Sequence, residues 1–147
     1  MFGLRPQEIV GLKWSDLRTD KKGTHTLTVE RAVTIAKDTT DSKFTTRPVL
    51  KGTKTGATRK LTVGQTVMNL LEDYKAYCES HWSDDRWDNI HNLMFPTPAG
   101  DIMSMKVLSQ RFKDVMRNIT DEQTAKFHKL YDLRHTHASQ LINEGWD

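Results

Sequence analysis

The sequence has 147 residues and a mass of 17.0 kDa, which is enough for one domain with one hydrophobic core. Hydrophobic residues make up 36% and charged residues 28%, a globular balance, and no uninterrupted apolar stretch approaches the roughly 18 residues of a membrane span. The net charge of +3 permits a polyanionic partner without requiring one. The single Cys78 cannot form an internal disulfide, so we expect a reducing, cytoplasmic environment.

The N-terminal half predicts a short helix followed by strands. Proline is tolerated in a first helical turn and an acidic side chain suits the positive end of the helix dipole, so a helix should begin at Pro6, followed by Glu8, with Arg5 at its N-terminal end. Apolar residues at alternate positions in 24–36 predict a strand with one buried face; they are Leu27, Val29, Val33 and Ile35. Residues 37–46 are polar and aperiodic, and 47–63 suggests a hairpin. Together these segments predict one small three-stranded antiparallel sheet.

The C-terminal half is expected to be mainly helical. Apolar spacing from 67 to 78 predicts an amphipathic helix with Thr66 as a cap and an apolar stripe in the core; that stripe consists of Val67, Leu70, Leu71, Tyr74 and Cys78. Prolines and glycine in 95–101 mark a turn, and a second amphipathic helix follows Ser104. Its expected apolar face comprises Val107, Leu108, Phe112, Val115, Met116 and Ile119. A last helix, capped by Asp132, should stop at Gly145. The predicted fold class is α+β, mainly α-helical.

Three basic residues lie at junctions between predicted elements: Arg5 at a helix start, Lys54 in the hairpin and Arg134 in the first turn of the last helix. Arginine suits a phosphate because its planar fork donates two parallel hydrogen bonds and keeps its charge. A lysine surrounded by other cations has a lowered pKa and can give a proton to a leaving oxygen near neutral pH. Each residue alone is most simply an ordinary solvated cation.

Four blocks in a fixed order resemble the catalytic domain of the tyrosine recombinase (phage integrase) family. GLRPQEIVGLKWSDL is similar to the first conserved box, which places the first catalytic arginine at Arg5. TKTGATRKLTV resembles the hairpin that carries the catalytic lysine, here Lys54, and LYDLRHTHASQLINEGWD resembles the second box with Arg134 as the second arginine. The segment FPTPAGDIMSMKVLSQRFKDVM is similar to the approach to the middle helix. The resemblance covers most of the chain.

The resemblance implies metal-independent transfer of DNA strands. Arginines would hold the nonbridging oxygens of the scissile phosphate, lysine would protonate the leaving 5′ oxygen, and a tyrosine would form a covalent 3′-phosphotyrosyl intermediate. Preorganised cations stabilise the charge gained in such a transition state. Double-stranded DNA carrying a recombination site is the implied substrate, other recombinase subunits in a DNA-assembled tetramer are the implied partners, and no cofactor, metal or membrane is expected.

Two departures from the family pattern bear on activity. The second box usually begins with histidine three positions before its arginine, where this chain has Tyr131. A phenol can still hydrogen-bond a phosphate oxygen, but it does not exchange a proton near pH 7 as an imidazole does. The other tyrosines, Tyr74 and Tyr77, lie on a predicted amphipathic helix, so none occupies the nucleophile position. We expect residues 1–147 to be a partial catalytic domain that lacks the N-terminal core-binding domain and the C-terminal nucleophile segment.

Other functional interpretations of single motifs are weaker. His135 and His137 are two positions apart and do not form the i, i+4 pair of a helical zinc site, even with His128 nearby, so we expect no metal. His135 is expected to face the phosphate with Tyr131 and His137 to pack locally. Lys54-Thr55-Gly56 lacks the partner motifs of penicillin-binding enzymes. Trp82 and Trp87 are expected to pack, Glu8 to orient Arg5 or cap its helix, and Asp16 to serve as a turn or cap residue.

Three functions therefore stay open. The resemblance predicts a site-specific recombinase whose 147 residues lack the nucleophile and are inactive alone. The alternative is a catalytically inactive DNA-binding module from a truncated integrase, and a third possibility is a scaffold that binds a protein partner. All DNA-directed readings require that Arg5, Lys54 and Arg134 fold into a single anion site.

Overall fold

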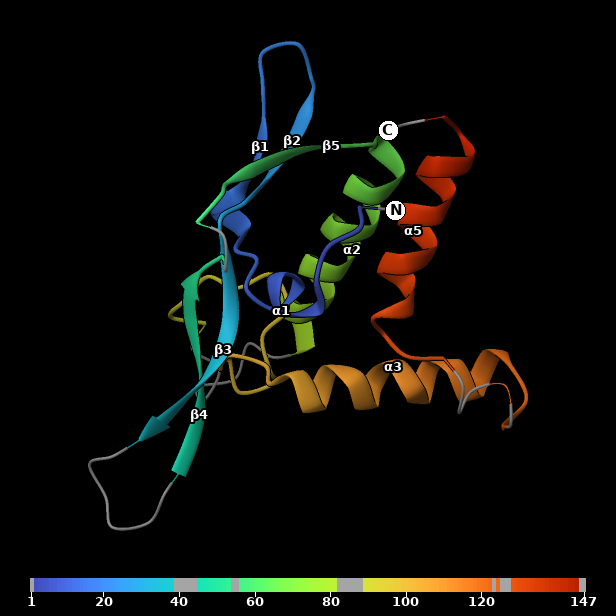
Figure 1. The fold of residues 1–147 in the computed structure, drawn as a ribbon. Coiled ribbons are helices and arrows are strands. Elements are labelled where there is room, and N and C mark those ends of the chain that lie inside the picture. Colours follow the sequence, from blue (N-terminus) through green and yellow to red (C-terminus); the bar gives the residue numbers. More distant parts are fainter. Residues whose placement is uncertain are drawn as a thin grey trace.

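A computed structural model of the protein describes residues 2–38, 45–53, 56–81, 89–122, 124 and 128–145. The fold is α+β, with helices around two small antiparallel sheets (Figure 1). The three-stranded sheet has the order β1 (Leu17–Thr19), β2 (His25–Val29) and β5 (Arg59–Val63). The two-stranded sheet pairs β3 (Arg31–Asp38) with β4 (Thr45–Gly52).

The sheet prediction was wrong in its pairing. The stretch predicted as one strand is divided at Glu30, so β2 joins one sheet and β3 the other. The predicted hairpin between the two halves of 47–63 does not form, because β4 pairs with β3 and β5 pairs with β2. Leu27, Val29 and Val33 are buried as predicted, whereas Ile35 is 53% exposed on the β3–β4 ribbon. That ribbon extends away from the rest of the molecule, which leaves its outer part without a covering layer (Figure 1).

The helices begin and end close to the expected positions. Helix α1 (Pro6–Ile9) starts with proline, followed by the 3-10 turn η1 (Trp14–Asp16). Helix α2 (Gln65–His81) includes Thr66, which is therefore not its cap. Ser104 caps α3 (Met105–Ile119) by accepting a bond from the Val107 N–H at 3.4 Å. Helix α5 (Asp132–Asn143) has Tyr131 rather than Asp132 at its N-cap and is followed by Gly145 at φ +79°, a left-handed stop.

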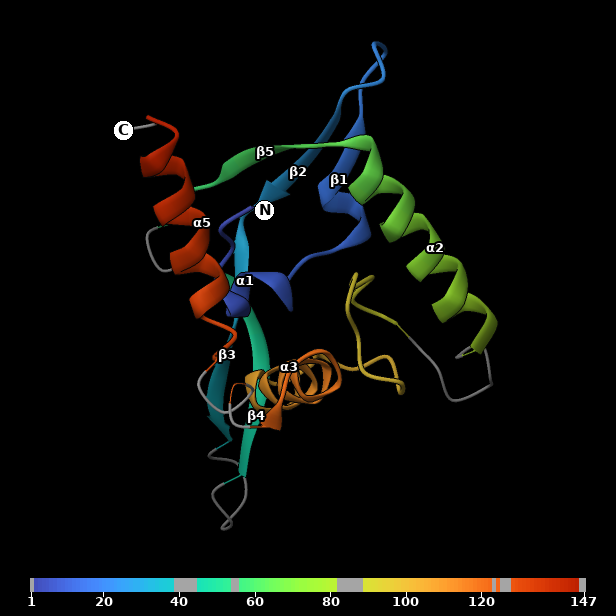
Figure 2. The ribbon, with the colours of Figure 1, turned by 90° about the vertical axis from the view of Figure 1, so that its right-hand side faces the viewer.

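Two buried clusters hold the elements together. One lies between the three-stranded sheet, α2 and the segment around Met94, and its buried members are Leu12, Leu27, Val29, Val63, Met68 and Met94. The other joins α1, β3 and the approach to α3 through Val10, Val33 and Met103. The predicted apolar stripes are only partly buried, since Leu70 on α2 and Val107, Val115 and Ile119 on α3 are exposed. Helix α5 lies beside α1 and the N-terminal segment in both views (Figures 1 and 2).

Candidate active site

Local sequence fixes Arg5 at the start of α1. Pro6 occupies the first helical position, and Arg5 is extended at the N-cap with φ −70° and ψ 143°. Three residues on, Glu8 accepts a hydrogen bond from the Arg5 backbone N–H at 2.7 Å and another from its guanidinium at 3.1 Å. One carboxylate thus holds both the backbone and the side chain of Arg5. The prediction that Glu8 orients this arginine is confirmed.

Glu8 is also bound by a second arginine. Arg59 donates to its two oxygens from Nη1 at 3.2 Å and Nη2 at 2.5 Å. The Glu8 side chain is 2% exposed, whereas those of Arg5 and Arg59 are 37% and 35% exposed. Burial alone would raise the pKa of Glu8. The hydrogen bonds from Arg59 and Arg5 lower the pKa by a larger amount, so it lies below the ordinary 4.5. One buried carboxylate faces two partly exposed guanidinium groups, and the cluster keeps a net positive charge.

Arg59 is a residue that the sequence analysis did not single out. It pairs with Val29 at the start of β5, and side-chain alternation places it on the same face as Leu61 and Val63, toward the protein interior. A cation on the inward face of a strand needs an acidic partner. That parity, together with the position of Arg59 at the start of the strand that follows the Lys-Thr motif, was the available signal.

The start of α5 brings Tyr131 to Arg5. The Tyr131 phenol contributes to raising the pKa of Arg5, after the larger effect of Glu8, through its charge and a side-chain hydrogen bond. The rings of Tyr131 and His135 lie 5.3 Å apart between centroids, tilted by 55°. The Tyr131 side chain is near the surface, with 43% of the residue exposed. A hydroxyl from the start of α5 therefore accompanies the first arginine, and the His135 ring lies against that tyrosine.

Arg134, in the first turn of α5, contacts the N-terminal segment that precedes Arg5. Its guanidinium Nη1 donates a hydrogen bond to the backbone carbonyl of Gly3, two residues before Arg5. Gly3 has φ +56°, and a Cβ built there would lie 2.4 Å from Cδ2 of His137. Only glycine lets the chain pass this close to the histidine ring. His137 lies against Gly3, in agreement with its predicted local role, and Arg134 contacts the backbone two residues before Arg5.

Lys54 lies outside the described residues. The chain on either side of it leaves β4 at Gly52 and enters β5 at Arg59, and the Thr53 hydroxyl donates to the Ala57 carbonyl at 2.9 Å across this connection. The connection joins the two sheets rather than the arms of one hairpin. Trp82 and Trp87 likewise fall outside the described residues, so their predicted packing stays a prediction.

The sequence model of the phage integrase family matches residues 2–147. The chain belongs to the phage integrase family. This match spans the first box at Arg5, the β5 segment and the second box at Arg134, so the residues that meet at the α1–α5 junction lie in matched parts of the family.

Two curated relatives resemble this integrase-family chain. A tyrosine recombinase XerC-like protein of Caldanaerobacter subterraneus is 23% identical over 97% of the chain, which covers 36% of that relative. Transposase A from transposon Tn554 of Staphylococcus aureus is 32% identical over 60% of the chain, which covers 23% of that protein. The chain therefore spans about a third or less of the length of these relatives.

The remainder of the first box has a structural role in this integrase-family chain. Asp16 is buried, accepts the Lys13 backbone N–H at 2.8 Å and binds the Arg31 guanidinium at 2.5 Å. It is a turn residue, as predicted. Trp14 packs against the first core cluster with the Lys75 ammonium 5.4 Å from its ring centre.

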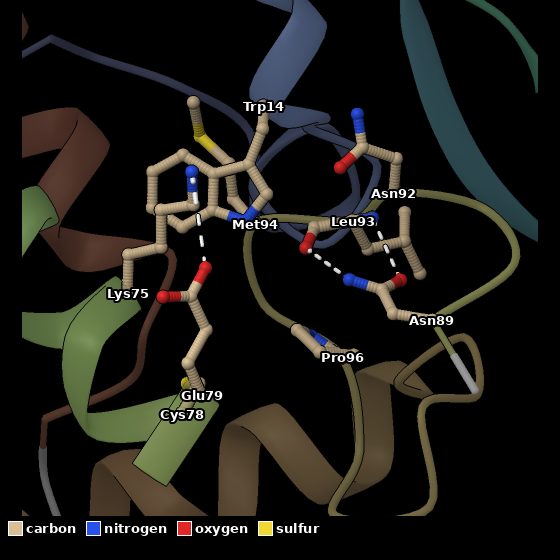
Figure 3. A pocket seen from close by; sticks show the side chains of 9 residues that line it. All are labelled: Trp14, Lys75, Cys78, Glu79, Asn89, Asn92, Leu93, Met94 and Pro96. Carbon is tan, nitrogen blue, oxygen red and sulfur yellow. Dashed lines mark hydrogen bonds and ion pairs between the residues drawn. The ribbon is translucent and has the colours of Figure 1, made fainter. Parts of the chain in front are cut away.

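A pocket of about 300 Å³ lies beside Trp14 (Figure 3), and its lining includes neither Arg5 nor Arg134. Its polar groups already bind each other. The Asn89 side chain donates to the Leu93 carbonyl and accepts its N–H, both at 2.9 Å, and Lys75 pairs with Glu79 at 3.9 Å. The pocket therefore lies between α2 and the segment around Leu93, and these polar groups bind within the protein rather than facing a ligand.

Neither tyrosine of α2 has the surroundings expected of an activated nucleophile. Tyr74 is half-buried with its ring 5.5 Å from that of Phe95, and burial together with a hydrogen bond to Cys78 raises its pKa. Tyr77 stacks on His81 at 4.1 Å. Both positions agree with the predicted packing or surface roles on this helix.

The described residues contain neither a candidate metal site nor a membrane-spanning helix. No group of three or more His, Cys, Asp or Glu side chains is arranged to hold a metal ion in that part of the chain. Within the same residues, no helix combines the length and apolar character needed to cross a membrane.

Proposed function

We propose that this chain is the phosphate-binding part of a site-specific DNA recombinase that cleaves and rejoins strands through a covalent phosphotyrosine. The observation that carries the proposal is that Tyr131 interacts with Arg5 and that Arg134 binds the Gly3 carbonyl, which brings the start of α5 to the N-terminal end of α1. Membership of the phage integrase family supports it. The relatives named as a tyrosine recombinase and a transposase support the same class of reaction.

The proposed roles follow from the chemistry of each group. Arg5 and Arg134 bind the nonbridging oxygens of the scissile phosphate, because guanidinium groups keep their charge and donate in pairs. Tyr131 and His135 complete the anion site as hydrogen-bond donors. The charge that develops on these oxygens in the transition state is stabilised more than the ground state, which accelerates the reaction. Glu8 and Arg59 act through Arg5 and are positioning residues.

Lys54 is the proposed general acid. A tyrosine loses its phenol proton to solvent and its oxygen attacks phosphorus, the bond from phosphorus to the 5′ oxygen breaks, and Lys54 transfers a proton to that leaving oxygen. We propose that none of Tyr74, Tyr77 and Tyr131 is the attacking group and that residues 1–147 alone bind DNA without cutting it. In the whole protein, further subunits would assemble on the DNA and the nucleophile would come from a segment beyond these residues.

The alternative is a DNA-binding module without catalysis. This alternative is favoured by Tyr131, which stands where the family usually has histidine. It is also favoured by the packing of Tyr74 against Phe95 and of Tyr77 against His81. Both functions require the same anion site, so they differ in covalent chemistry and not in affinity.

The test is incubation of the protein with labelled duplexes that cover the ends of the genetic element encoding it, followed by denaturing electrophoresis. Residues 1–147 should shift the duplex in a native gel and give no protein-linked DNA, whereas the uninterrupted reading frame should give a covalent product. Arg5→Ala and Arg134→Ala should abolish that product. Arg117→Ala, which removes an exposed arginine paired with Asp114 on α3, is the matched control and should keep it. Normal cleavage by either site variant would overturn the assignment.

A further inference from the structure

A second pocket adjoins the candidate site at Tyr131. It has a volume of about 250 Å³ and lies between α3, the segment 128–131 that leads into α5, and the first residue of α1. Tyr131, a residue of the candidate site, lines the pocket, and so does Pro6, which follows Arg5 in the sequence. The pocket therefore adjoins the Arg5 site. A strand of DNA seated at Arg5 that continues past Tyr131 toward α3 reaches this pocket next.

The lining combines apolar and basic side chains with Ser109 and Tyr131. The apolar residues, here called the apolar floor, are Pro6, Met105, Phe112 and Leu130. The basic residues are Lys113 from α3, and Lys129 and His128 from the segment before α5, with no carboxylate among the lining residues. In the part of the chain that the structure describes, neither lysine side chain forms an ion pair.

These features define the ligand. Two ammonium groups from different elements that form no ion pair within the described residues attract a phosphate, although the Asp132 carboxylate accepts the Lys129 backbone N–H at 2.6 Å beside the pocket. The apolar floor suits the carbon face of a sugar and gives no reason to bind a bare inorganic anion. The pocket is too small for a base pair and open to the surface. One sugar-phosphate unit meets both requirements.

We propose that this pocket binds the nucleotide next to the scissile phosphate, with its phosphate on Lys113 and Lys129 and its sugar on the apolar floor. The proposal rests on the proposed function, since it takes Arg5 as the seat of the scissile phosphate. It makes these lysines a second anchor that fixes the direction of the strand across Tyr131. A free nucleotide has the same chemistry, and the experiment separates the two sources.

The experiment is a double-mutant cycle between protein and DNA, read as binding affinity at fixed salt. Duplexes carry a neutral methylphosphonate at one phosphate at a time, and each is titrated with the wild type and with Lys113→Gln/Lys129→Gln. The control is Lys21→Gln/Lys22→Gln, which removes the same charge from the turn between β1 and β2, at the opposite end of the molecule from α3 (Figures 1 and 2). Titration with deoxynucleoside monophosphate is the arm for a free ligand.

The double variant should bind unmodified DNA roughly tenfold or more weakly and lower the slope of log K against log salt by about 1 to 2, as loss of two phosphate contacts requires. A methylphosphonate beside the scissile position should weaken the wild type and the control but leave the double variant nearly unchanged. Saturable monophosphate binding with no such DNA position would assign the pocket to a free nucleotide and overturn its role on the strand. Additive losses at every position, with no monophosphate binding, would overturn the site itself.

Failure of the proposed function gives a different pattern. In that case no methylphosphonate position would show coupling to Arg5→Ala. Coupling to Arg5 without coupling to the lysines would refute the second anchor alone.

Discussion

The Glu8 carboxylate and the Arg59 guanidinium join α1 to the start of β5 across 51 positions of sequence. Arg59 is the first residue of the strand that follows the connection containing Lys54. The same carboxylate holds Arg5. The pair therefore fixes the first arginine and one end of the lysine-bearing segment relative to each other, before any DNA is bound.

Arg59→Gln should lower the free energy of unfolding by about 1–2 kcal/mol. Removing one partner of a fully buried pair costs more, but Arg59 is 35% exposed and Arg5 still neutralises Glu8 in the variant. Urea unfolding followed by circular dichroism gives the value. Lys60→Gln is the control, because the adjacent residue is exposed and points to the other face of β5. Equal losses in the two variants would contradict a specific role for the Arg59 pair.

Glu8 should make stability depend on acid pH. Its folded pKa is lowered below 4.5, so the unfolded chain takes up a proton first; this contribution is fully present above pH 4.5 and is lost as the pH falls through the folded pKa. Glu8→Gln should cost about 1–3 kcal/mol at pH 7, and the difference from the wild type should shrink below pH 4.5. Urea unfolding at pH 7, 5 and 3.5 measures the difference.

The control for this pH dependence is Glu72→Gln, which changes an exposed carboxylate on α2. It should change stability little at any of the three pH values. A wild-type to Glu8→Gln gap that stays constant down to pH 3.5 would show that the ionised carboxylate does not support the fold.

Gly3→Ala should destabilise the protein more than Gly23→Ala. Both glycines have positive φ, +56° and +80°, which costs an alanine about 1–2 kcal/mol at either position. A Cβ at Gly23 meets nothing within 4 Å, whereas one at Gly3 collides with His137. The collision should add about 1–3 kcal/mol. Paired thermal unfolding curves isolate this difference, and equal midpoints would mean that the contact of Gly3 with His137 is absent in solution.

Tyr131→His should add a further pH dependence to strand cleavage. An imidazole next to Arg5 changes charge between pH 5 and 8, whereas a phenol at this position does not. In the uninterrupted reading frame, the rate of strand cleavage by the variant should vary across that range. Tyr131→Phe removes the hydroxyl alone and should reduce cleavage about 10- to 100-fold. Full activity of Tyr131→Phe would exclude the hydroxyl from the anion site.

Much of the helical part of the fold could be predicted because its signals are local. Pro6 at a first helical position, Ser104 as a cap and Gly145 as a left-handed stop each depend on a few neighbouring residues. The burial of whole faces could not be predicted in the same way. Val115 and Ile119 continue the apolar pattern of α3 but remain exposed, since burial depends on which element lies opposite.

The sheet pairing could not be predicted because its alternation continues across the break. Leu27, Val29 and Val33 share one parity, and only Arg31 interrupts it, directly after the break at Glu30. One polar residue in an alternating run does not by itself reveal a change of partner strand. The three-residue β1 has no pattern long enough to detect. Of the site residues that the family resemblance supplied, Arg134 contacts the Gly3 carbonyl, two residues before Arg5, while Arg59 required the register of β5.

The bond from Arg134 to the Gly3 carbonyl has a consequence for ligand entry. A guanidinium has five N–H donors, and this contact occupies one terminal nitrogen while the rest of the fork stays available. The peptide group thus selects a single orientation for a long side chain that would otherwise sample many. The Arg134 side chain has therefore lost conformational entropy already during folding, so binding of an anion does not require that loss a second time.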